Sequence, residues 1–167
     1  MSVVMQQWRR PTLMGLFDVF KIKPKYAPPS YAAVVSIMVT LEVDGEPSLF
    51  VLLTKNGTVN RMGTGNDQSP DTNMFIGVTD PSVFNRVLKR SVPVIDQWIG
   101  RFDSPDIEGQ SCKLVLGFKN LDGTELLSQW AYGSQSIGPP SVVSAIVLES
   151  LHATERWYIQ QKQVVRG

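Results

Sequence analysis

The sequence predicts an α+β fold: a mainly antiparallel sheet of about five or six strands, packed by two or three helices and ending in a long C-terminal helix. Residues 33–43 and 112–118 alternate apolar and polar side chains, as half-buried strands do. Residues 141–162 repeat apolar side chains at helical spacing. The predicted element order is β-β-β-β-α-β-β-α.

The first three predicted strands are joined by recognisable turns. Residues 33–43 lead through Asp44-Gly45 into residues 48–54, which are apolar on both faces and are therefore predicted to lie centrally in the sheet. Asn56-Gly57 favours a type I′ hairpin, because both of its turn positions need a positive φ. Residues 58–62 are the predicted hairpin partner.

The middle of the chain predicts a loop, a short strand and a helix. Residues 63–73 lack large apolar side chains, which is typical of a surface loop, and residues 74–78 form a short strand pattern. Asp80 followed by Pro81 is typical of a helix N-terminus. Pro93 predicts a break in this helix, with a further turn or two before Gly100.

The second half repeats the strand pattern and then becomes helical. Residues 112–118 and 126–132 are predicted strands around a turn at residues 120–123. A Ser/Gly/Pro loop at residues 134–140 then leads into a helix from about Ser141 to Lys162.

Composition narrows the class of protein. The 167 residues are 43% hydrophobic and 19% charged with a net charge of +1, which is typical of one globular domain. This balance argues against a nucleic-acid partner, which needs clustered Lys and Arg. Cys112 is the single cysteine, so no intrachain disulfide can form. We therefore expect a reducing compartment, the cytoplasm.

The N-terminal 30 residues differ from the rest. We interpret 1–30 as an amphipathic arm with a Pro-rich linker, 31–163 as a single domain and 164–167 as a tail; Met14 is an alternative start to Met1. The arm's apolar residues have helical spacing, which predicts a partner-binding segment that docks on its own domain or on a neighbouring subunit. Peripheral membrane contact through residues 13–22 and disorder of the segment are the alternatives. The candidate partner-binding residues are Trp8, Leu13, Leu16, Phe17 and Phe20.

No reactive constellation is evident, so we assign no catalytic residue, metal or cofactor. His152 with Ser134 or Ser136 lacks a nucleophile elbow and an orienting carboxylate. Cys112 falls on the apolar face of its strand, which predicts a packed core thiol. The acidic residues at 103–108 lack the spacing of a calcium loop and are interpreted as a solvated surface.

Two places remain where a ligand could bind. Glycines beside a cation let backbone N–H groups approach an anion, and a loop entering a helix N-terminus offers free donors. The candidate ligand-binding residues are Arg61, Gly63, Thr64, Gly65, Tyr132 and Ser134. The favoured hypothesis is a non-catalytic protein-interaction or assembly module that meets a protein partner or forms a homo-oligomer. The alternative is a small-molecule or nucleotide-binding enzyme that uses Arg61 and the Gly63–Gly65 loop.

Overall fold

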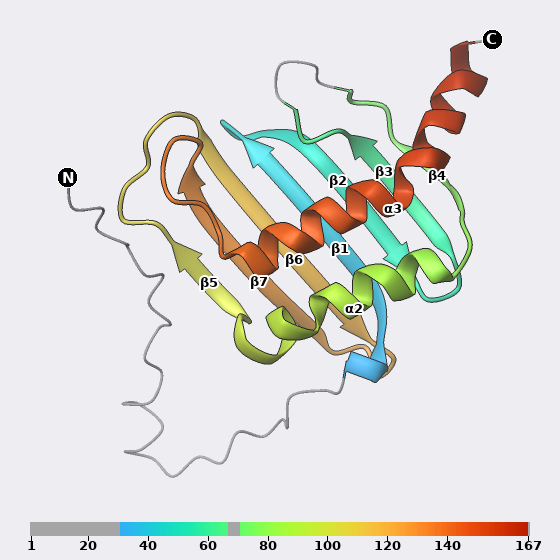
Figure 1. The fold of residues 1–167 in the computed structure, drawn as a ribbon, viewed down its shortest axis with the longest axis horizontal. Helices are drawn as coiled ribbons and strands as arrows, with labels where there is room; N and C mark the ends of the chain where they lie inside the picture. The colour runs from blue at the N-terminus through green and yellow to red at the C-terminus, as the bar shows by residue number, and fades with distance from the viewer. Residues whose placement is uncertain (1–30, 67–70, 167) are drawn as a thin grey trace.

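The computed structural model describes residues 31–66 and 71–166, which form one sheet with helices on one side (Figure 1). The elements in chain order are η1 (Tyr31–Ala33), β1 (Val34–Val43), β2 (Glu46–Thr54), β3 (Thr58–Gly63), β4 (Phe75–Val78), α2 (Ser82–Gln97), β5 (Gly100–Asp103), β6 (Ser111–Asn120), β7 (Glu125–Gly133) and α3 (Ser141–Arg166). The α+β class and the antiparallel pairing of the predicted hairpins are confirmed. The predicted type I′ turn at Asn56-Gly57 is wrong, because only Gly57 has a positive φ there.

The described strands form a seven-stranded sheet in the order β4-β3-β2-β1-β6-β7-β5, with β1 at its centre. All neighbouring strands are antiparallel except β5, which pairs in parallel with β7. The predicted five or six strands are therefore too few, because the sequence analysis predicts no strand at β5. Its four residues include two charged side chains and carry too little alternation to predict a strand.

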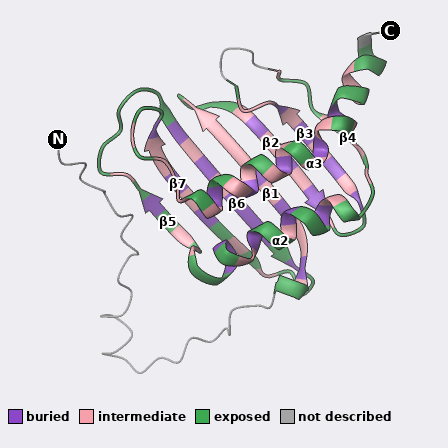
Figure 2. Cartoon of the chain, in the orientation of Figure 1, coloured by how far each residue is buried: buried purple, intermediate pink, exposed green. Residues whose placement is uncertain are grey.

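Two helices, α2 and α3, cover one face of the sheet and contact each other (Figure 1). Alternate residues of the strands point toward these helices and form the hydrophobic core. Its members from β1 and β2 include Ile37, Val39, Leu49, Val51 and Leu53, and those from the helices include Val87, Val143 and Ile146. Figure 2 shows buried residues along the strands and exposed residues along the outer sides of both helices.

Both helices are longer than the sequence suggested. The predicted break at Pro93 is wrong: α2 continues through it to Gln97. Proline removes one N–H donor from the helix, but Val94 and Ile95 immediately after it are buried in the core and hold that turn in place. Similarly, α3 extends to Arg166, four residues beyond the predicted end. None of the described helices is long and apolar enough to cross a membrane.

Candidate functional site

Arg61 of β3 is the first candidate ligand residue, and the structure places its side chain in the interior. The residue is 1% exposed because it points from the sheet into α3. Its Nη1 donates to Thr154 Oγ1 at 2.9 Å and to the Leu151 carbonyl at 3.2 Å, and its Nη2 donates to Glu155 at 2.7 Å. Its Nε donates to the Gly63 carbonyl at 3.5 Å, so the guanidinium hydrogen-bonds to α3 and to its own strand.

An aromatic ring completes the surroundings of Arg61. Its guanidinium carbon lies 4.1 Å from the centroid of the Tyr158 ring, and Lys162 lies 4.4 Å from the same centroid. The Tyr158 hydroxyl donates to Asp71 at 2.7 Å, and Lys162 lies 3.8 Å from the same carboxylate. Burial acts to raise the pKa of Asp71, but the hydrogen bonds from Tyr158 and Asn73 and the charge of Lys162 outweigh it. The pKa of Asp71 is therefore lower than its usual value. This cluster ties β3 and residue 71 to α3.

The Tyr158 phenol gives the cluster a measurable alkaline signature. Burial, followed by the hydrogen bond and the negative charge of Asp71, raises the pKa of Tyr158 from 10.0 to about 12. Because the unfolded chain ionises first, the contribution of this group is complete below pH 10 and is lost between pH 10 and about 12. Urea denaturation across this range should show a smaller decline in the free energy of unfolding for Tyr158→Phe than for the wild type. Equal declines would contradict the pKa shift.

The glycines of the Gly63–Gly65 loop serve backbone geometry. Gly63 has a φ of +77°, and a Cβ there would lie 2.2 Å from the Ser48 carbonyl oxygen. The Gly65 N–H donates to the same oxygen at 3.1 Å, and Thr64 Oγ1 accepts from the Asn66 N–H at 3.3 Å. The donors that were candidates for an anion are therefore partly used to close the end of the β2–β3 hairpin.

Tyr132 in β7 and Ser134 just after it lie toward the opposite edge of the sheet from Arg61. The strands β2, β1 and β6 separate β7 from β3, a distance of about 19 Å at the usual strand spacing. Ser134 Oγ accepts from the Gln110 N–H at 2.9 Å, which joins the two loops at this end of the sheet. Burial, with a smaller effect of Cys112, raises the pKa of Tyr132 to about 12. The structure therefore does not bring the six candidate ligand residues together, and ligand binding by them stays a prediction.

The structure also shows where the other residues considered for catalysis or metal binding lie. Cys112 is buried in β6, as predicted, and His152 is exposed on α3. Asp103 forms an ion pair with Arg101 at 2.9 Å, and Asp106 and Glu108 are exposed. Within residues 31–66 and 71–166, no group of three or more His, Cys, Asp or Glu is arranged to hold a metal ion. The predicted partner-binding residues Trp8, Leu13, Leu16, Phe17 and Phe20 lie outside the described residues.

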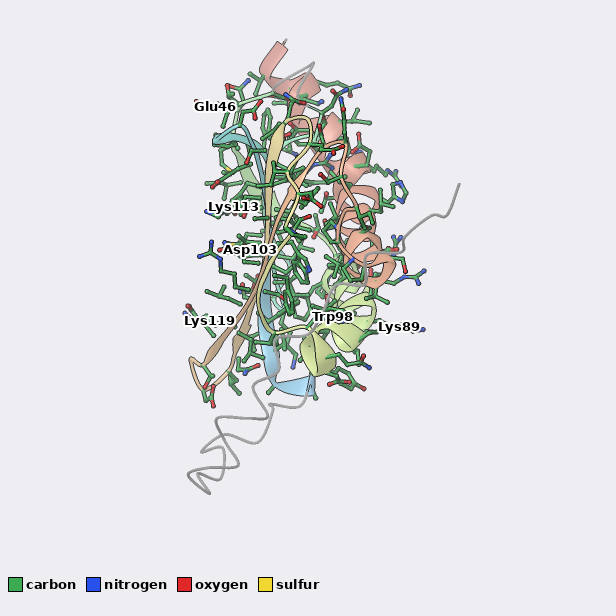
Figure 3. All side chains as sticks on the ribbon, turned by 90° about the vertical axis from the view of Figure 1, so that its left-hand side faces the viewer. Glu46, Lys89, Trp98, Asp103, Lys113 and Lys119 are labelled. Carbon is green, nitrogen blue, oxygen red and sulfur yellow. The ribbon has the colours of Figure 1, made fainter. Side chains whose placement is uncertain are left out.

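The second face of the sheet is a surface that the sequence analysis missed. Figure 3 views the sheet from its side and shows both helices on one side of it, with Lys113, Asp103 and Lys119 on the other. None of the described elements packs on this second face, which we call the open face. The strands place one mainly apolar row across it, in register from β4 to β7, with Asn60 as its polar member. The row consists of Ile76, Asn60, Leu52, Met38, Gly117 and Leu127.

The open-face row forms a strip in which four of the six members carry apolar side chains, whereas Asn60 is polar and Gly117 has no side chain. A Cβ on Gly117 would lie 3.1 Å from Met38 and 3.3 Å from Leu127, so these two side chains lean over the glycine from either side. Ile76 and Leu127, at the two ends of the row, are 69% and 52% exposed. A second, parallel row adds further apolar side chains, Met62, Phe50 and Val115.

Charged pairs border the strip on the open face. Lys113 lies 3.5 Å from Glu42, Lys119 lies 3.9 Å from Glu125, and Arg101 pairs with Asp103. An apolar centre with a polar rim is the usual anatomy of a protein interface. The described residues thus define an α+β protein in which α2 and α3 cover one face of the sheet and no described element covers the other. No protein-family model, curated protein or solved structure matches the chain.

Proposed function

We propose that this chain is a non-catalytic protein-interaction or assembly module whose contact surface is the open face. The observation that carries the proposal is the open-face row, which crosses six neighbouring strands with four apolar side chains and has no described element packed on it. The row spans about 24 Å at the usual strand spacing. Contiguous apolar surface rimmed by polar groups marks interaction sites on soluble proteins.

The sequence of β2 supports the proposal independently. Leu49, Val51 and Leu53 point into the core, whereas Phe50 and Leu52 between them lie on the open face. A strand that is apolar on both sides is typical of a sheet that is covered on both sides. The described residues cover one side, so a protein segment is expected to cover the other. Because the chain has a single cysteine and a net charge of only +1, we propose the cytoplasm as its location and a protein as its partner.

The proposal predicts that a chain shortened by residues 1–25, the greater part of the N-terminal arm, associates with itself through the open face. Because the core cluster consists of described residues, the chain from residue 26 to residue 167 should fold, which a cooperative thermal transition would show. In light scattering, we expect the average mass of this shortened chain to increase with its concentration and to exceed the mass of one copy. Leu127→Lys should return it to a single copy, because a charge on the apolar row must be desolvated on contact.

Leu148 offers a matched control. It is 54% exposed, close to the 52% of Leu127, but it lies on α3, on the other side of the sheet. Leu148→Lys should therefore leave association unchanged. A shortened chain that stays a single copy at every concentration, or that responds equally to both substitutions, would contradict the open face as the contact surface.

A further inference from the structure

We infer that the open face is covered by the chain's own N-terminal arm, in the same molecule. This inference rests on the proposed function, because it names the segment that occupies the proposed contact surface. In it, residues 13–22 form an amphipathic helix whose apolar side packs on the open-face row.

Charge is the first argument for the arm. Residues 1–30 contain five basic residues and one acidic residue, a net charge of +4. The other 137 residues contain 11 basic and 14 acidic residues, a net charge of −3 with His neutral. The near-neutral total therefore hides two oppositely charged parts. The arm therefore carries a net charge opposite to that of the domain to which it is tethered, which favours contact between the two.

The point of entry is the second argument. The described chain starts at Tyr31 and turns through η1 directly into β1, the central strand. Beside this point lies a shallow hollow of about 450 Å³, lined by Val35, Ser36, Thr54, Lys55 and Asn56. Ser36 and Thr54 are paired across β1 and β2 on the open face. Each lies two residues along its strand from the open-face row. The hollow thus connects the start of the domain with the surface to be covered.

Length is the third argument. The eight residues 23–30 reach at most about 26 Å, enough to pass from Tyr31 over the hollow. Residues 13–22 as a helix measure about 15 Å, comparable with the distance that four or five residues of β1 span. The four apolar side chains at helical spacing are Leu13, Leu16, Phe17 and Phe20. They would meet Leu52 and Met38 of the open-face row, and Asp18 and Lys21 would remain on the flanks.

The direction of the chain would bring the basic residues of the arm near acidic residues of the domain. An arm that runs from the entry point along β1 carries its earlier residues toward the far end of the strand. Arg9 and Arg10 then approach the β1–β2 turn, where Glu42, Asp44 and Glu46 lie within five residues. Tethering favours this arrangement further, because a short linker gives the arm an effective concentration of about a millimolar at its own domain.

Crosslinking in the full chain tests the inference. The test chain carries Cys112→Ala, Asp18→Cys on the flank of the arm, and either Leu127→Cys on the open face or Leu148→Cys on α3. With a short bismaleimide, intact mass spectrometry should show about tenfold more intramolecular product for the 127 pair than for the 148 pair. Adding Phe17→Ser and Phe20→Ser should lower the 127 product to the level of the 148 control, with the melting transition retained.

Several results would overturn the inference. Equal intramolecular yields for the two pairs would mean that the arm has no preferred position. Product at twice the chain mass from the 127 pair would show that the arm lies on the open face of a second copy. Absence of product would show that the arm does not lie on the open face. Failure of this inference is distinct from failure of the proposed function. If crosslinking fails but the shortened chain associates through Leu127, the open face binds protein but the arm does not cover it.

Discussion

Replacing Arg61 with alanine is expected to lower the free energy of unfolding by about 3 kcal/mol. The substitution removes a buried guanidinium together with its hydrogen bonds to Thr154 and Leu151 and its contact with the Tyr158 ring. It also leaves a space between β3 and α3 that neighbouring atoms fill incompletely. Urea denaturation monitored by circular dichroism measures the effect.

Arg86 provides the matched control for Arg61. Each arginine forms an ion pair at 2.7 Å, Arg61 with Glu155 and Arg86 with Glu149. The Arg86 side chain is 57% exposed, whereas that of Arg61 is 1% exposed. Arg86→Ala should therefore change stability by less than about 1 kcal/mol. If Arg61→Ala were as mild as Arg86→Ala, Arg61 would not be a structural residue and the ligand hypothesis for it would regain support.

Replacing Gly63 with alanine is the second large effect, with an expected loss of about 3 kcal/mol. The new Cβ would lie 2.2 Å from the Ser48 carbonyl oxygen, which belongs to β2 and cannot move aside without breaking the hairpin end. The positive φ of this position adds strain for any residue with a side chain. The midpoint and slope of a urea titration give the change.

Gly65 separates the two causes of the Gly63 effect. Its φ of +76° is almost the same as the +77° of Gly63, but no atom lies within 4 Å of a Cβ placed there. Gly65→Ala should therefore cost only the backbone strain, about 1 kcal/mol. Equal losses at the two positions would show that the close contact with Ser48 contributes nothing.

Local sequence signals predicted most of the fold. Alternation in β1 and β6, the Asn-Gly turn before β3 and the helical spacing of α3 act within one element or one hairpin. The strand β5 was missed because it is defined by its parallel pairing with β7, about 28 residues later in the chain. The continuation of α2 through Pro93 was missed because burial of Val94 and Ile95 outweighs the missing hydrogen bond.

The candidate site was harder to predict because its chemistry depends on contacts distant in sequence. Arg61 beside two glycines has the pattern of an anion site, but its partners Thr154 and Glu155 lie more than 90 residues away. The open face had a signal in Phe50 and Leu52, which alternate with core residues of the same strand. That pattern predicts a strand covered on both sides, yet it does not say which side α2 and α3 cover.

The most direct test of the central claim compares Leu127→Lys with Leu148→Lys in the chain of residues 26–167. If the open face is the contact surface, light scattering will show a single copy for Leu127→Lys and continued association for Leu148→Lys. If the shortened chain stays a single copy without either substitution, or if both substitutions act alike, the open face is not that surface.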